Sequence, residues 1–95
     1  MKHYYLTVTF HAKENCEELF VRELEESGIA DTIRAEKGCI RYDFFYPAKK
    51  NNSVFLFEEW ETRADQELHI TQPHMDQMRA VKAKYVLSTD LKVLE

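Results

Sequence analysis

Two side chains in the second half of the chain combine the types and spacing that acid–base chemistry needs. His69 carries an imidazole, which titrates near pH ~6.5 when unperturbed and therefore exchanges protons at neutral pH. Glu58 lies between Leu56 and Trp60 on one face of an expected strand, and an acid on an apolar face is either paired or titrates with a raised pKa. Glu58 would then orient His69 or act as the general base itself. The alternatives are a helix-end packing role for His69 and an ion pair across a dimer for Glu58.

A second histidine, His74, follows Pro73 in what we expect to be the first turn of a helix. The positive end of the helix dipole disfavours an imidazolium there, which suggests a neutral ring. His74 would contact a substrate or serve as a structural hydrogen-bonding group. His69 and His74 lie five residues apart across a proline, and no third ligand has recognisable spacing. We therefore expect no metal site.

Aromatic side chains would supply the walls of a binding pocket. Tyr42 and Trp60 suit a planar substrate, and the Tyr42 hydroxyl can donate to a developing enolate or phenolate oxygen. The alternative is that both rings belong to the core. His11 ends the first expected strand and would reach the pocket mouth. A phosphate-bearing substrate would need positively charged side chains around it. The candidates are Lys49, Lys50, Arg63 and Arg79. The alternative is that these side chains are solvated on the surface.

The composition limits the classes of protein to consider. The 95 residues are 44% hydrophobic and 32% charged, which is enough apolar surface for one small core and excludes a disordered chain. Thirteen Lys and Arg against seventeen Asp and Glu give a net charge of −4, which argues against nucleic-acid and anionic-membrane binding. No apolar run is long enough for a membrane span or a signal peptide. We expect a single cytoplasmic domain over residues 1–95, with Cys16 and Cys39 as reduced packing residues.

Hydrophobic periodicity predicts four strands and two helical crossovers. Alternating apolar positions mark strands over 4–10, 39–46, 54–60 and 86–94, with 47–53 as a loop. A helix capped by Asn15 would be interrupted at Gly28 and resume to about residue 35. Thr62 would cap a short helix over 63–70, and a further helix, capped by Thr71 or Gln72, would carry Met75, Met78, Ala80, Val81 and Tyr85 on one face.

The order of these elements is β-α-β-β-α-β, which predicts a ferredoxin-like α+β fold with helices on one face of an antiparallel sheet. The expected strand over 54–60 carries Phe55 and Phe57 on one face and Leu56 and Trp60 on the other. Both faces must therefore be covered. Since the chain is too short to supply more helices, we expect a two-fold homodimer that packs sheet to sheet.

Three segments together resemble a known family. They are Gly-Cys-Ile-Arg-Tyr-Asp at 38–43, Phe-Leu-Phe-Glu-Glu-Trp at 55–60 and His-Ile-Thr-Gln-Pro-His at 69–74. The chain is similar to the antibiotic biosynthesis monooxygenase superfamily, and within it to quinol-monooxygenase-like proteins and autoinducer-2 phosphate isomerases. The resemblance implies a dimeric α+β barrel, with His69 as acid or base, Glu58 as its partner, and Tyr42, Trp60 and His74 around the substrate.

Two segments depart from the family pattern. Glu36-Lys37-Gly38 stands where the family often has Glu-Pro-Gly, and we expect this change to alter a turn only. Haem-degrading relatives carry a haem-ligand histidine in the last helix, whereas this chain has Gln-Met-Arg-Ala at 77–80. Haem binding of that kind is therefore not expected.

The sequence shows no Gly-rich nucleotide loop, flavin signature or metal cluster. We therefore expect chemistry without a cofactor. One possibility is a monooxygenase in which a base deprotonates a quinol-like ring and the anion passes an electron to O2. The second is an isomerase that moves a proton beside the carbonyl of a small hydroxyketone phosphate. Both need a base, an oxyanion donor and a dry aromatic pocket. The third is a non-catalytic dimer that binds a small aromatic ligand.

Overall fold

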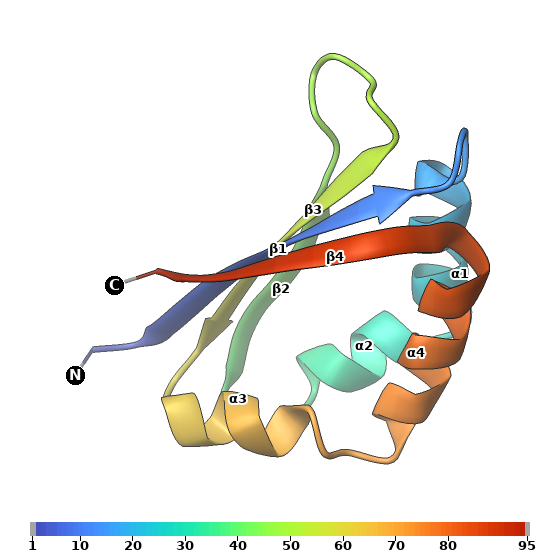
Figure 1. The fold of residues 1–95 in the computed structure, drawn as a ribbon. Helices are drawn as coiled ribbons and strands as arrows, with labels where there is room; N and C mark the ends of the chain where they lie inside the picture. The colour runs from blue at the N-terminus through green and yellow to red at the C-terminus, as the bar shows by residue number, and fades with distance from the viewer. Residues whose placement is uncertain (1, 95) are drawn as a thin grey trace.

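In the computed structural model, which describes residues 2–94, one four-stranded sheet carries all the helices on one side (Figure 1). The strands are β1 (Tyr4–Ala12), β2 (Cys39–Phe45), β3 (Ser53–Trp60) and β4 (Val86–Leu94), in the order β2-β3-β1-β4. Every neighbouring pair is antiparallel. The ferredoxin-like α+β fold predicted from the sequence is therefore confirmed.

Each crossover between strands contains two helices. The first connects β1 to β2 through α1 (Glu17–Glu26) and α2 (Ile29–Arg34), and the second connects β3 to β4 through α3 (Arg63–His69) and α4 (His74–Tyr85). The predicted break at Gly28 is present, since this residue has a φ of +86° at the N-cap of α2. The predicted cap of α3 is also present, because Thr62 Oγ1 accepts the backbone N–H of Asp65 at 3.1 Å.

Two helix starts differ from the prediction. Cys16 occupies the N-cap of α1, while Asn15 has a φ of +60° and donates its backbone N–H to Asn52 Oδ1. Asn15 therefore belongs to a turn held by the β2–β3 connection. Pro73 itself occupies the N-cap of α4, so neither preceding polar residue caps that helix.

Three apolar side chains lie on faces that hydrophobic periodicity assigns to the core, yet they are exposed. Ile40 is 42% exposed because the β2–β3 register shifts between Cys39 and Arg41. Leu19 on α1 is 43% exposed, and Ala80 on α4 faces solvent. Both helices therefore bury a narrower stripe than the hydrophobic pattern suggested.

The core lies between the sheet and the helices. Leu6, Val8 and Phe10 of β1 project toward the helices and are at most 5% exposed. They meet Phe20 of α1 and other fully buried side chains, which include Leu24, Ile33, Tyr42, Leu56 and Trp60. The sequence periodicity located this side of the sheet correctly.

The other sheet face carries no helix in the single chain. Tyr5, Phe55 and Phe57 lie on it, and Phe55 is 38% exposed. Strand β4 is also sparsely covered on the helix side, where Leu91 pairs with Val8 yet is 58% exposed. No helix within the described part of the chain is long and apolar enough to cross a membrane.

Gly38, at the turn into β2, is the glycine whose replacement should be most costly. Its φ is +82°, and an added Cβ would overlap the side chain of Asp65. We expect Gly38→Ala to lower the free energy of unfolding by roughly 2–4 kcal/mol, because backbone strain and overpacking act together. Gly28→Ala is the control, since Gly28 has a φ of +86° with open space around it. Urea unfolding should show the larger loss for Gly38→Ala, and equal losses would contradict the steric part of the argument.

Candidate active site

A cavity of about 180 Å³ lies between the helix-facing side of the sheet and the second crossover. Residues of α3 and α4 form one wall, and residues of strands β1 to β4 form the other. Tyr42, Glu58 and His69 line it together, so the structure brings three of the five predicted site residues to one cavity. Its other lining residues are Val8, Phe10, Leu56, Gln66, Ile70, Met75, Met78, Arg79, Lys82, Thr89 and Leu91.

The cavity is mainly apolar with one exposed edge. Met75 and Met78 of α4 are both less than a tenth exposed, whereas Leu91 of β4 is largely open to solvent. Apolar walls around a few titratable groups are typical of small-molecule sites, because they exclude water and strengthen electrostatic interactions. Strand β4 therefore forms the side through which a ligand would enter.

The imidazole of His69 is fixed from both sides. Its Nδ1 lies 3.0 and 3.1 Å from the two carboxyl oxygens of Glu36. A carboxylate only accepts hydrogen bonds, so Nδ1 carries the proton and Nε2 keeps its lone pair. The Trp60 indole stacks on the other side, with ring centroids 4.7 Å apart. Burial lowers the pKa of His69, and the Glu36 hydrogen bond opposes that effect. His69 is therefore held as a neutral base at pH 7.

The carboxylate next to His69 is Glu36 rather than the expected Glu58. Glu36 immediately precedes the Lys37–Gly38 turn, and its Oε2 also accepts a hydrogen bond from His74 Nε2 at 2.6 Å. Glu36 thus bridges two imidazoles that come from α3 and α4. The sequence signal is the Glu-Lys-Gly segment before β2, whose difference from the Glu-Pro-Gly of the family predicts a change in a turn but says nothing of the Glu36 carboxylate.

Glu58 uses its carboxyl group differently. Its Oε1 accepts the Trp60 indole N–H at 2.9 Å, and the side chain is 5% exposed. Burial raises the pKa of Glu58 to about 7, with the Trp60 hydrogen bond acting in the opposite direction and the charge of Glu36 adding to the rise. Glu58 therefore exchanges protons near neutral pH inside the cavity, as the apolar strand face suggested.

Tyr42 lies in the wall and forms an edge-type aromatic pair with His69, at a centroid distance of 6.0 Å. Burial, followed by the negative charge of Glu58, raises its pKa well above the ordinary value. The phenol therefore stays protonated and can donate. Neither Trp60 nor His74 lines the cavity. Trp60 packs on the His69 ring, and His74 bonds the Glu36 carboxylate.

The remaining predicted residues lie elsewhere, with one exception. His11 bonds Asp90 on the open sheet face, and Lys49, Lys50 and Arg63 do not line the cavity. Arg79 does, and Lys82 joins it from the next turn of α4. Arg79 also bonds the Ile70 carbonyl oxygen at 2.8 Å and Asp76 at 3.0 Å. Two cations from α4 therefore lie at the cavity.

Both cysteines are free thiols, as expected. Burial raises the pKa of Cys39 to about 11, and the nearby charges of Glu36 and Glu58 add to this rise. A thiol that stays protonated is a poor nucleophile. Cys39 is therefore a packing residue beside the site.

Replacing Glu36 tests how the imidazole is positioned. Because the carboxylate raises the His69 pKa, we expect Glu36→Gln to lower this pKa further, as measured by NMR titration of the ring protons. We also expect turnover to fall roughly 10-fold as the ring loses its fixed orientation. Glu59→Gln is the matched control, because Glu59 pairs with His3 instead. An unchanged His69 titration in Glu36→Gln would contradict this arrangement.

Comparison with known proteins identifies relatives of this architecture. The family model described as antibiotic biosynthesis monooxygenase matches residues 3–81. An uncharacterized protein of Synechocystis, sll1783, is 39% identical over 41 residues, which cover 43% of this chain and 28% of that protein. The chain thus matches little more than a quarter of that curated relative's length.

Several solved structures share the fold. PA3566 from Pseudomonas aeruginosa is 22% identical with a TM-score of 0.83, covering 99% of this chain and 93% of that one. A putative antibiotic biosynthesis monooxygenase from Nitrosomonas europaea is 20% identical with a TM-score of 0.85, covering 97% and 88%. At these identities the similarity concerns the fold alone.

Proposed function

Because this chain belongs to the antibiotic biosynthesis monooxygenase family, we propose that it is a cofactor-independent monooxygenase of a quinol-like or small aromatic substrate. The observation that supports this most directly is the neutral imidazole of His69 at an apolar cavity. Its Nδ1–H is held by Glu36, so Nε2 is the nitrogen available as a base. The substrate lies in the cavity between the sheet and α3 and α4.

In the first step, His69 Nε2 takes a proton from a ring hydroxyl of the substrate. The resulting phenolate is electron-rich and transfers an electron to O2, and recombination forms a carbon–oxygen bond on the ring. One oxygen atom stays on the product and the other leaves as water. For a hydroquinone the product is a hydroxyquinone. The substrate loses four electrons in this conversion and O2 accepts four, so the reaction balances without an external reductant.

The other residues of the cavity have complementary roles. Tyr42 donates its hydroxyl proton in a hydrogen bond to the developing oxyanion, since its raised pKa keeps it protonated. Glu58, with a pKa of about 7, relays the second proton of the reaction. Trp60 and His74 are positioning residues, which hold the imidazole and the Glu36 carboxylate in place.

We also propose that the protein works as a homodimer. The helix-free sheet face exposes Phe55 and carries Tyr5 and Phe57, and a second copy packed face to face would cover these rings. Light scattering should give twice the mass of 11.3 kDa. A monomer at micromolar concentration would reject this part of the proposal.

Oxygen uptake with a panel of hydroquinones tests the activity. With at least one hydroquinone, we expect one molecule of O2 to be consumed for each molecule of product formed. With 18O2, one labelled oxygen atom should appear in that product. The test includes His69→Gln, which should remove this uptake. Binding of the ligands without oxygen uptake would instead favour the non-catalytic alternative.

Isomerisation of a small hydroxyketone phosphate is the second candidate, and the two cations of α4 favour it. Arg79 and Lys82 line the same cavity as His69 and would face an anionic group there. Deuterium exchange beside the carbonyl of such a substrate, followed by NMR in D2O, tests this reaction. Exchange without oxygen uptake would replace the monooxygenase proposal.

A further inference from the structure

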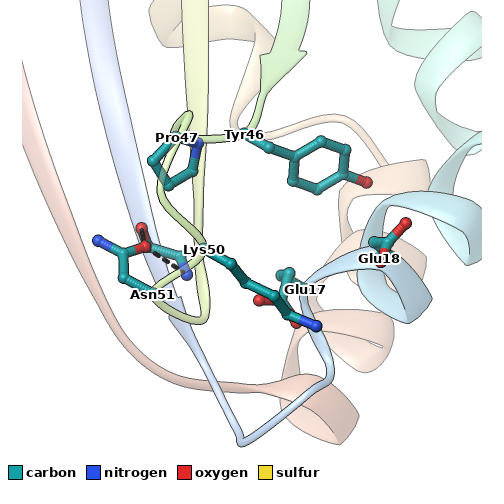
Figure 2. A pocket seen from close by; sticks show the side chains of 7 residues that line it. Glu17, Glu18, Tyr46, Pro47, Lys50 and Asn51 are labelled. Carbon is teal, nitrogen blue, oxygen red and sulfur yellow. Dashed lines mark hydrogen bonds between the residues drawn. The ribbon is translucent and has the colours of Figure 1, made fainter.

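A second cavity, of about 230 Å³, lies where the start of α1 meets the connection between β2 and β3 (Figure 2). Its lining residues are Glu17, Glu18, Tyr46, Pro47, Lys50, Asn51 and Ser53. None of them lines the cavity of His69. The connection lies at the top of Figure 1 and α3, which carries His69, at the bottom.

Glu17 is the unusual residue of this second cavity. Its side chain is buried, with the residue 3% exposed, and neither carboxyl oxygen has a hydrogen-bond partner within residues 2–94. Buried carboxylates are normally paired, because an unpaired charge loses its hydration without compensation. Glu17 also lies in the first turn of α1, where the helix dipole favours a negative charge. A cation from outside the chain would satisfy both oxygens.

The cavity is built by a loop that is held in place. The Asn52 carbonyl oxygen accepts the Ala12 N–H at 2.8 Å, and the Asn52 side chain accepts the Asn15 N–H at 3.1 Å. These bonds fix the 46–53 segment against the end of β1 and the start of α1. A ligand would therefore meet a loop whose backbone is already ordered, which lowers the entropic cost of binding.

The walls indicate an organic cation. Tyr46 and Pro47 make one side apolar, and an aromatic ring beside a carboxylate suits a cation with an attached apolar part. Among the described residues, no cluster of three or more His, Cys, Asp or Glu side chains could hold a metal ion. Lys50 lines the cavity but forms no ion pair with Glu17 among the described contacts. The Glu17 oxygens are unpaired within the 2–94 range but shielded from solvent, so a ligand reaches them when exposed side chains at the cavity mouth, such as that of Lys50, move aside.

We propose that this cavity binds a small molecule carrying a guanidinium or primary ammonium group, with Glu17 as its ion-pair partner. The two free carboxyl oxygens match the parallel N–H groups of a guanidinium. The apolar part of the ligand lies against Tyr46 and Pro47. This site is independent of His69 and of the proposed oxygenation.

Titration of the full chain with butylguanidinium, followed by amide NMR, tests the proposal, with the neutral isostere butylurea as the ligand control. We expect butylguanidinium to bind at least 10-fold more tightly and to shift amides at 15–18 and 46–53. Glu17→Gln should lose at least 10-fold in affinity. Glu26→Gln, on the exposed far end of the same helix, should retain it. Lys50→Gln should bind more tightly because a like charge is removed.

Three outcomes would overturn the proposal. Equal affinity for the cation and the urea would show that charge plays no part. Unchanged affinity in Glu17→Gln would place the ligand elsewhere. The third outcome combines two observations: Glu17→Gln changes the oligomeric mass, and butylguanidinium does not bind the original chain. Together they would show that a second copy of the chain pairs with the Glu17 carboxylate. The amide spectra report the fold of each variant in the same experiment. Lys50→Gln keeps Glu17 intact, so its predicted gain in affinity tests the role of charge even if Glu17→Gln does not fold.

Discussion

Replacing His69 by glutamine should lower kcat/KM for the best hydroquinone by about 10²–10⁴-fold, which is the usual contribution of a positioned general base. Glutamine can still donate an N–H to Glu36, so the hydrogen bond that holds the side chain is kept. What is lost is the Nε2 lone pair. The amide is far too weak a base to take a phenolic proton, and the reaction is expected to slow at the deprotonation step.

Matched variants separate loss of the base from loss of the fold. His11→Gln changes a histidine that bonds Asp90 on the open sheet face, so its turnover should stay within about twofold of the original. His74→Gln alters a neighbour of Glu36 and should cost less than His69→Gln. Circular dichroism and thermal unfolding check each fold. Retention of more than a third of the activity in a folded His69→Gln would rule out the base.

The topology could be predicted because the sheet and helices follow simple hydrophobic periods. Leu6, Val8 and Phe10 alternate along β1 and all face the helices. The same period put Glu58 on the buried face of β3, where an acid is either paired or titrates with a raised pKa, and burial raises the pKa of Glu58. Side chains alternate between the two faces of a strand, so each residue can be assigned to a face without knowing which strand pairs with it.

Pairings between distant residues could not be predicted in this way. The carboxylate that holds His69 comes from Glu36, 33 residues earlier, and its position depends on the path of the Lys37–Gly38 turn. Periodicity does not determine that path. The N-cap of α1 is Cys16 instead of Asn15 for a related reason, since the contact of Asn15 with Asn52 outweighs its local capping preference.

The buried carboxyl group of Glu58 should also govern how stability depends on pH. Its pKa is about 7 in the folded chain, against an ordinary value of 4.5. The folded state therefore holds a proton that the unfolded state releases as the pH rises above about 4.5. The contribution of this group to stability is fully present below that pH and is lost as the pH rises through about 7.

We therefore expect Glu58→Gln to be more stable than the original chain at pH 8 by about 3 kcal/mol, because each pKa unit is worth about 1.4 kcal/mol. Near pH 4 both chains carry a neutral group here and should unfold alike. Urea unfolding at the two pH values checks this, with the exposed Glu61→Gln as a control that should show no such gain. A gain that is the same at both pH values would contradict titration of Glu58 and point to packing. A gain confined to high pH would mean that the protein gives up stability to keep an ionisable acid inside the cavity, as a proton relay requires.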